Sequence, residues 1–513
     1  MKLDKTHILF IFIVGIFVTI NFFNLSKYGI SWDEPDQHNI GRVTLSYLGL
    51  GNEPAHLGKD LGNYGPFFET TNEIIAICLS RFFDIHYIDS HHIFIVLFAS
   101  VGLVFLFLFA KTTFDKEVAV YSVVFLSLFP RFIGHAHYNS KDIPIMVLSV
   151  IVLFFLYETF KRKKYCSAVI AGFFFGVCLA IRINALLILP VYFTSYILFI
   201  SVRFEKAQDM QNKIYLKKDL ILLSIFFCFS SLSTFLLWPS LWNNPFLFFR
   251  TIYYFLHHSW PGDVLYLGKV YSGNNLPWHY SPLYLLIVTP SITLFFFLIG
   301  FMASLKNLAD KKISMEHILL LCWLFIPLLV TMKPGIVKYD GIRHIFLVLP
   351  PLTILAGIGL KLLIKKINNH FHSKKKIITA VLLLIAFHSI REIKKVSPYE
   401  GSYFNEPTRL FLPKNIENYF EIEYWGVAYR EGVNWLNKNA AINAIICVPI
   451  AGHLMEFYWK RKDISFSCVG EIDYVMFITR MTQFPRVRER FKFKRVFQIS
   501  RYNSNLLYIF KVI

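Results

Sequence analysis

Acidic and basic side chains that could carry out group transfer occur at three widely separated places in this 513-residue sequence. They are Asp33 and Glu34, Lys141 and Asp142, and Arg343 and His344. A carboxylate can accept the proton of an attacking hydroxyl, and cations can balance the charge on a departing phosphate. These residue types point to transfer of a group from a phosphate, provided that the fold brings the three places together.

The acidic pair lies in residues 29–36, Gly-Ile-Ser-Trp-Asp-Glu-Pro-Asp, directly after the first apolar segment. Residues at helical spacing follow, and glycines end the run; the spaced residues are Ile40, Val43, Thr44, Tyr47 and Leu48. This pattern predicts a short amphipathic helix in the membrane interface with Asp33 and Glu34 at its head. The alternative is that the carboxylates only suit the positive end of that helix.

The other two places also have purely structural explanations. Asp142 precedes Pro144, which fits the first turn of a helix, so Asp142 could serve only as a helix cap. Lys141 and Arg343 could merely extend their charged ends toward lipid headgroups. From the residues alone, both explanations stay open beside the catalytic one.

The composition is that of a polytopic membrane protein. The sequence is 55% hydrophobic and 18% aromatic, its mean hydropathy is positive, and charge-free runs long enough to cross a bilayer recur along it. The net charge of +20 does not indicate nucleic-acid binding, because much of the positive charge falls in short loops between apolar runs. The first apolar run lacks a small-residue cleavage site, so we expect it to be a retained span.

Eleven membrane spans are predicted from these apolar runs. They cover residues 8–25, 91–110, 118–130, 142–160, 165–181, 185–202, 220–237, 283–305, 315–331, 345–360 and 377–390. With a cytoplasmic N-terminus, the inside segments carry 22 Lys and Arg in 57 residues, and the outside segments 12 in 135. Basic residues concentrate on the cytoplasmic side, so we expect the C-terminus and all three candidate groups outside. Residues 66–83, with Glu69 and Glu73, are predicted to be a second interfacial segment.

The sequence changes character from about residue 391. Alternating apolar runs predict strands at residues 444–448, 474–479, 495–499 and 506–512, and helical spacing is found at 426–437 and 452–460. We therefore expect an extracytoplasmic α/β domain of residues 391–513 after a membrane domain of residues 1–390. Two of the seven cysteines, Cys447 and Cys468, lie in this tail, where a disulfide is possible but no motif supports it.

The segment of residues 238–282 is rich in aromatic residues, including Trp238, Trp242, Trp260 and Trp278. They could form a belt at the membrane interface, which we favour, or a floor on which sugars stack. His257 and His258 with Glu69 or Glu73 could bind a metal, but no ligand spacing supports this, and we favour a surface histidine pair. Divalent-metal dependence therefore stays unassigned.

Six stretches of the sequence form an ordered set that extends from the first loop into the tail. They are residues 32–35 (Trp-Asp-Glu-Pro), 130–144, 277–280 (Pro-Trp-His-Tyr), 339–344 running into 349–351, 403–405 (Tyr-Phe-Asn) and 423–426 (Glu-Tyr-Trp-Gly). This set resembles the GT-C-fold glycosyltransferases that use polyprenyl-phosphate sugars. That superfamily includes the protein O-mannosyltransferases and the lipid A aminoarabinose transferase, and the likeness is to its bacterial membrane branch.

The resemblance implies a GT-C fold, with about eleven transmembrane helices forming the catalytic domain, and roles for individual residues. Asp33 matches the catalytic aspartate of the first loop, and Asp142 the second acidic position before the fourth span. Arg343 falls where the family places a cation that contacts phosphate. Glu423 stands where an Asp is expected, so a role for that carboxylate is in doubt. The metal-binding positions of the family cannot be placed in this sequence.

Together these observations predict a glycosyltransferase at the outer face of the cytoplasmic membrane. It would pass one sugar from a polyprenyl-phosphate donor to a hydroxyl of a glycan, lipid or protein acceptor. The expected catalytic residues are Asp33 as general base, with Glu34 and Asp142, and the expected phosphate-binding residues are Arg343, Lys141 and His344. Inversion at the anomeric carbon is expected, because a single displacement needs only one base.

Two other functions compete with this prediction. A transporter or flippase of lipid-linked sugars usually has paired halves, and charges or broken helices near mid-membrane. This sequence has no evident internal repeat, and its candidate charges lie at loop ends. A non-catalytic assembly subunit that uses the tail for docking is the third alternative.

Overall fold

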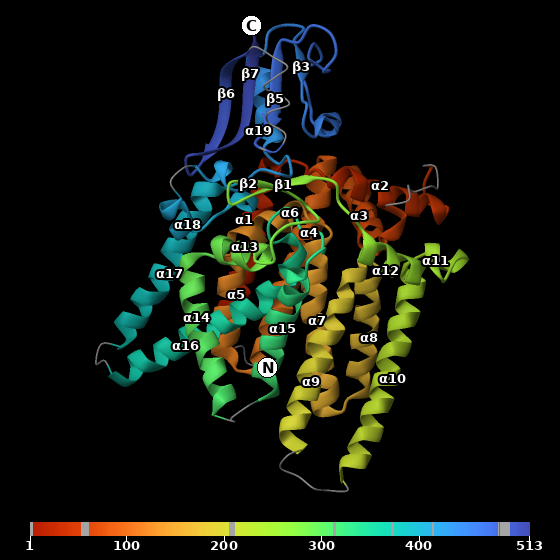
Figure 1. The fold of residues 1–513 in the computed structure, drawn as a ribbon, viewed down its shortest axis with the longest axis vertical. Helices are drawn as coiled ribbons and strands as arrows, with labels where there is room; N and C mark the ends of the chain where they lie inside the picture. Colours follow the sequence, from red (N-terminus) through yellow and green to blue (C-terminus); the bar gives the residue numbers. More distant parts are fainter. Residues whose placement is uncertain are drawn as a thin grey trace.

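The computed structural model describes residues 4–52, 61–204, 211–310, 314–370, 374–412, 415–480, 482 and 493–513. A bundle of long helices forms most of the molecule, and a β-sheet stands at one end of the bundle (Figure 1). Helix α1 (Lys5–Asn24) runs from the N-terminus toward the sheet (Figure 1). We call the end of the bundle that carries the sheet the tail face.

Eight helices in the described ranges are long and apolar enough to cross a membrane. They are α1, α4 (Tyr87–Thr113), α7 (Asp142–Arg162), α9 (Ile188–Phe204), α10 (Gln211–Leu237), α14 (Ser291–Ala309), α15 (Met315–Met332) and α16 (Leu349–His370). A ninth crossing is added if α5 (Lys116–Ser127) and α6 (Pro130–Tyr138), which meet at an angle of 66°, form one span. The predicted helical membrane architecture is confirmed.

Four predicted spans are interrupted, short or more polar than a single long apolar helix. Pro130 opens a new helix within the third, and Pro290 separates α13 (Tyr280–Val288) from α14 within the eighth, because proline cannot continue a helical hydrogen-bond ladder. The fifth is α8 (Tyr165–Leu179), which has only 15 residues, and the eleventh is α17 (Lys374–Val396), which has lysines at both ends. By length and composition, the described residues thus support eight or nine of the eleven predicted crossings.

The segment after α1 forms two helices at the tail face, α2 (Glu34–Tyr47) and α3 (Phe67–Phe83) (Figure 1). The first was predicted as an amphipathic helix and the second only as an interfacial segment, and neither has the length or composition of a span. Gly41 allows them to approach closely, because a Cβ at this position would lie 2.7 Å from the Glu69 carbonyl oxygen. The pair holds Asp33, the residue before α2, at the tail face.

The segment between α10 and α13 also lies at the tail face. It contains α11 (Ser240–Asn243), α12 (Leu247–His257) and an antiparallel hairpin of β1 (Asp263–Tyr266) and β2 (Lys269–Ser272). The hairpin meets the tail through the Gly268 N–H, which donates to the Tyr419 carbonyl at 3.1 Å. It therefore connects the bundle to the C-terminal part of the chain.

The tail contains a five-stranded sheet in the order β4-β3-β5-β7-β6. Its strands are β3 (Ile445–Cys447), β4 (Ser465–Phe466), β5 (Tyr474–Ile478), β6 (Phe493–Arg501) and β7 (Ser504–Val512). Four of them were predicted, and β4 was missed because two residues give no alternation. Helix α19 (Tyr429–Asn439) packs on the sheet with Gly432 close to Met476 and Leu507. Cys447 and Cys468 form a disulfide.

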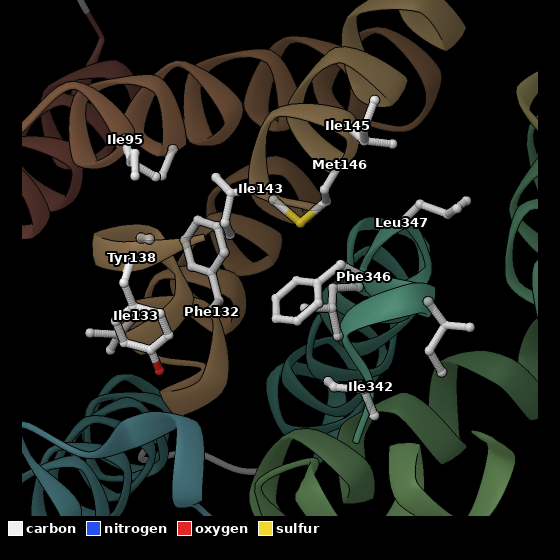
Figure 2. Packing of buried hydrophobic residues seen from close by; sticks show 14 of the residues in the cluster. Ile95, Phe132, Ile133, Tyr138, Ile143, Ile145, Met146, Ile342, Phe346 and Leu347 are labelled. Carbon is white, nitrogen blue, oxygen red and sulfur yellow. The ribbon is translucent and has the colours of Figure 1, made fainter. Parts of the chain in front are cut away.

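Buried apolar side chains beneath the tail face fix the segments that carry the candidate cations. Figure 2 shows Met146 of α7 facing Phe346 of the 3-10 helix η4 (Arg343–Val348), with Phe132 and Ile143 beside them. All four are at most 2% exposed. Because close-packed interiors resist displacement, this cluster sets the positions of Lys141, at the start of α7, and of Arg343, at the start of η4.

Candidate active site

The segment that carries Asp33 is held in place by the tail. The Trp32 N–H donates to the Trp425 carbonyl at 2.7 Å, and the Ile30 N–H donates to the Tyr458 hydroxyl at 2.9 Å. Gly29 permits this approach, because a Cβ there would lie 2.3 Å from the Val427 carbonyl oxygen. The position of Asp33 thus depends on residues from the far end of the chain.

The Asp33 side chain makes no capping hydrogen bond at the start of α2. Its Oδ2 instead accepts from Nη1 of Arg343 at 2.9 Å and lies 3.7 Å from Nζ of Lys141, with 31% of the side chain exposed. Burial would raise the pKa of Asp33, but Lys141 and Arg343 together hold that pKa below its ordinary value. Asp33 is therefore an ionised, partly accessible carboxylate that faces two cations.

Arg343 is buried among aromatic rings at the start of η4. Its guanidinium lies 4.6 Å from the centre of the Tyr339 ring and 5.2 Å from that of Trp425, and its Nε is 3.5 Å from Oδ2 of Asp340. Only 6% of its side chain is exposed. The arginine is thus directed into the protein, so extension toward lipid headgroups does not describe it. His344 meets the Tyr339 ring edge-on at 4.8 Å.

Lys141 is also turned inward. Its Nζ lies 4.7 Å from the centre of the Tyr64 ring, and 15% of the side chain is exposed. Burial would lower the pKa of Lys141, but the Asp33 carboxylate more than offsets this and holds that pKa above its ordinary value. Lys141 is therefore a fixed positive charge beside Asp33.

Asp142 is paired with an arginine that the sequence analysis did not select. Its Oδ1 accepts from Nη1 of Arg182, and its Oδ2 accepts from Nδ2 of Asn139 at 3.0 Å. The helix cap is made by Asn139, whose Oδ1 accepts from the Asp142 N–H at 2.8 Å. Arg182 acts electrostatically on Asp33 and Lys141. In the sequence, Arg182 is a single charged residue between two apolar runs, and this pattern could have identified it as a candidate.

Glu34 is turned away from Asp33. One carboxylate oxygen lies 2.8 Å from Nε2 of His92 on α4, the other accepts from the Ser31 N–H, and the residue is 1% exposed. Glu34 therefore joins α2 to α4 beneath the site. The structure brings Asp33, Lys141 and Arg343 together, and it places Asp142 and Glu34 in contacts that support them.

A pocket of about 190 Å³ opens beside Asp33 and Arg343. Its other lining residues come from four parts of the chain: Trp32 of the first loop; Trp260, Gly262 and Asp263; Tyr339 and Asp340; and Tyr424, Trp425 and Arg480 of the tail. Trp260 stacks in parallel on Tyr339 with ring centres 4.2 Å apart. Trp242 and Trp278 are 43% and 60% exposed, so the aromatic segment supplies both a pocket wall and outward-facing rings.

The tail contributes one charged residue to the pocket, Arg480, which was not predicted as a site residue. Arg480 follows β5, with its guanidinium 5.1 Å from the centre of the Trp32 ring and 5.8 Å from that of Trp260. Glu423, in contrast, accepts from the Val427 N–H at 2.8 Å and stabilises the turn before α19. Burial raises the pKa of Glu423 to about 7. Glu423, which stands where the resemblance leads us to expect an Asp, therefore occupies a structural position.

Among the described residues, no group of three His, Cys, Asp or Glu side chains is arranged to hold a metal ion. His257 bonds to the Tyr253 carbonyl at 2.9 Å, while Glu73 pairs with His91 and Glu69 accepts from the Ser140 hydroxyl at 2.7 Å. These side chains are engaged with other partners and do not form a set of metal ligands, so we assign no reaction step to a metal.

Comparison with known proteins agrees with this architecture. Residues 79–238 match the family described as dolichyl-phosphate-mannose-protein mannosyltransferase. No curated protein matches the chain. ArnT from Cupriavidus metallidurans bound to undecaprenyl phosphate is 12% identical, with a TM-score of 0.51 and 97% of each chain covered.

Two structures of an archaeal oligosaccharyltransferase are also similar. AglB from Archaeoglobus fulgidus in complex with an inhibitory peptide and a dolichol-phosphate is 11% identical, with a TM-score of 0.53 over 95% of this chain and 72% of that one. The apo form of the A. fulgidus enzyme is 12% identical, with a TM-score of 0.53 over 85% of this chain and 58% of that longer one. The chain therefore has the GT-C fold that its sequence stretches predicted.

Proposed function

We propose that this protein transfers one sugar from a polyprenyl-phosphate donor to a hydroxyl of a glycan, lipid or protein acceptor. The observation that carries the proposal is the convergence of Asp33 with Arg343 and Lys141 beside a pocket at the tail face. The family matched by residues 79–238 is named for dolichyl-phosphate-mannose, and the similar ArnT structure holds undecaprenyl phosphate. A lipid phosphate is the ligand that suits such a set of cations.

In the proposed reaction, the acceptor oxygen attacks the anomeric carbon while the bond from that carbon to the phosphate oxygen breaks. The hydroxyl proton goes to Asp33, and the polyprenyl phosphate leaves with the bonding electron pair. Arg343 and Lys141 stabilise the negative charge on the phosphate. One base and one displacement invert the configuration of the anomeric carbon.

The remaining residues have positioning roles in this proposal. Asp142 holds Arg182 near the phosphate side of the site, and Glu34 fixes the start of α2 through Ser31 and His92. His344 supports the phosphate side through its contact with Tyr339, over which the Arg343 guanidinium lies.

Asp33 is a weak base while it is paired with two cations, because they lower its pKa. A donor phosphate that takes over Arg343 and Lys141 would weaken this effect, and the pKa of Asp33 would rise. The donor thereby increases the basicity of the carboxylate that receives the acceptor's proton.

For the location, we propose a cytoplasmic-membrane protein with a cytoplasmic N-terminus and the tail face outside. The charge asymmetry of the loops supports this orientation, and so does the disulfide between Cys447 and Cys468, because disulfides persist in oxidising compartments. Residues 1–390 would then be the membrane catalytic domain with an interfacial first loop, and residues 391–513 the extracytoplasmic domain, with α17 continuing to Val396 across that boundary.

Mass spectrometry of glycolipids, glycans and glycoproteins from a deletion strain tests the function. We expect one class of molecule to lack a single sugar, and wild-type protein but not Asp33→Asn to restore it. A flippase predicts another outcome: lipid-linked sugar would accumulate in the inner leaflet, and Asp33→Asn would restore export. That result, or no missing sugar, would overturn the proposal.

A further inference from the structure

Arg480 of the tail lies close to two carboxylates without a direct hydrogen bond to either. Its Nη2 is 3.9 Å from Oδ1 of Asp340, and its Nε is 3.7 Å from Oε2 of Glu421. Direct N–H···O bonds are about 2.7–3.2 Å long. Within the described ranges, neither carboxylate oxygen has another hydrogen-bond partner. An oxygen that lies to one side of each pair can be about 2.8 Å from both atoms and so bridge them.

These groups are buried, so their unmade hydrogen bonds are costly. Asp340 is 6% exposed, Glu421 3% and Arg480 7%. The Nε of Arg343, which also lines the pocket, likewise has no hydrogen-bond partner within the described part of the chain. Buried polar groups without partners are rare in native proteins, and binding sites are among the places where they occur.

The backbone around Asp340 is also unusual. Asp340 has a φ of 56° and Gly341 a φ of 69°, so two successive residues adopt the left-handed conformation. This turn directs Oδ2 of Asp340 to the Trp425 indole N–H at 3.1 Å and leaves Oδ1 toward Arg480. Strained residues of this kind cluster at ligand-binding sites.

We propose that the pocket is the donor's glycosyl subsite, and that Arg480 and Asp340 recognise hydroxyl groups of the sugar. This inference rests on the proposed function. A glycosyl group joined to the phosphate by one oxygen must lie next to Arg343, which lines the pocket. A pocket of about 190 Å³ is large enough for one monosaccharide. The rings of Trp260 and Trp32 supply apolar walls for the sugar's C–H faces.

Binding measurements on the full-length protein in nanodiscs test this subsite. The probes are undecaprenyl phosphate without sugar, and undecaprenyl phosphate carrying mannose, glucose, galactose or arabinose. We expect at least one glycosylated carrier to bind wild type more tightly than the bare carrier. Arg480→Gln and Asp340→Asn should weaken that binding about tenfold, since each removes one or two hydrogen bonds to charged groups. Arg480→Gln should leave binding of the bare carrier within about twofold.

Matched variants and the bare carrier separate the outcomes. Arg495→Gln removes an exposed tail arginine and should change neither affinity. If the variants lose equal affinity for bare and glycosylated carriers, Arg480 and Asp340 only support the fold or the phosphate contact. If they lose no affinity for either carrier, the subsite is also overturned. If no sugar adds affinity to wild type, the subsite fails while the proposed function stands. If wild type does not bind bare carrier, the proposed function itself fails.

Discussion

The Asp33 carboxylate accepts a 2.9 Å hydrogen bond from the Arg343 guanidinium, across 310 positions of sequence. This contact joins the residue before α2 to the residue that opens η4, and both lie at the tail face. It also explains why Asp33 makes no helix cap: its side chain is engaged by Arg343.

Asp33→Asn tests the proposed base directly. Asn has no useful basicity, so we expect sugar transfer by the purified protein to fall by about 10²–10⁴-fold. Donor binding should be retained, because the amide leaves Arg343 and Lys141 in place. Asp36→Asn, which removes an exposed carboxylate from the same helical turn, is the control and should stay near the wild-type rate. A monodisperse Asp33→Asn protein with wild-type turnover would exclude the catalytic role.

Arg343→Lys tests the phosphate contact. The guanidinium can make two parallel bonds to phosphate oxygens, whereas an ammonium offers a single point of charge. Losing one hydrogen bond to a charged group should slow transfer by about 10- to 100-fold. The measurement is turnover at saturating donor, with the exposed Arg250→Lys as control. An unchanged rate in Arg343→Ala would show that the cation has no part in transfer.

The pH dependence of transfer should change in Lys141→Gln. In wild type without donor, the cations hold the pKa of Asp33 below its ordinary value, so kcat/KM, which reports the free enzyme, should persist as the pH falls to about 4. Removing Lys141 removes one of the two neighbouring cations that lower this pKa, so the loss of activity should begin at a higher pH. Lys141→Arg keeps the charge and should keep the wild-type profile. If activity is lost at the same low pH in wild type and in both variants, this electrostatic account is contradicted.

Thermal stability should depend on the ionisation of Glu69. Burial raises the pKa of Glu69 from 4.5 to about 8, so the folded protein retains a proton that the unfolded chain releases. Its stabilising contribution is complete below pH 4.5 and is lost as the pH rises through about 8. Glu69→Gln mimics the protonated form, so its Tm should fall less between pH 5 and pH 8, whereas the exposed Glu456→Gln should follow wild type. Parallel curves for Glu69→Gln and wild type would count against a protonated Glu69.

Membrane orientation can be tested with single cysteines at Leu50 and Val469, which are 72% and 83% exposed. Ser31 and Ser402 are buried and would be poor sites. In a variant without the five free cysteines, both new thiols should react with a membrane-impermeant reagent in intact cells. A cysteine at Lys116, the first residue of α5, should react only after lysis. The opposite pattern would place the tail in the cytoplasm.

Local sequence determined most of the secondary structure. The spacing of apolar residues predicted α2, and alternation predicted β3, β5, β6 and β7, because both periods arise from backbone geometry over a few residues. Charge-free runs located the spans, although prolines at 130 and 290 divided two of them. The ordered stretches of sequence also predicted the fold class.

Only the tertiary structure decided which charges meet. Asp33 pairs with Arg343, Glu34 turns to His92, Asp142 holds Arg182, and Arg480 reaches the pocket from the tail. Sequence could nominate carboxylates and cations, but each pairing joins segments separated by at least 40 positions. Such partners depend on how helices pack and on how close glycines such as Gly29 allow the chain to approach, and neither is encoded in local periodicity.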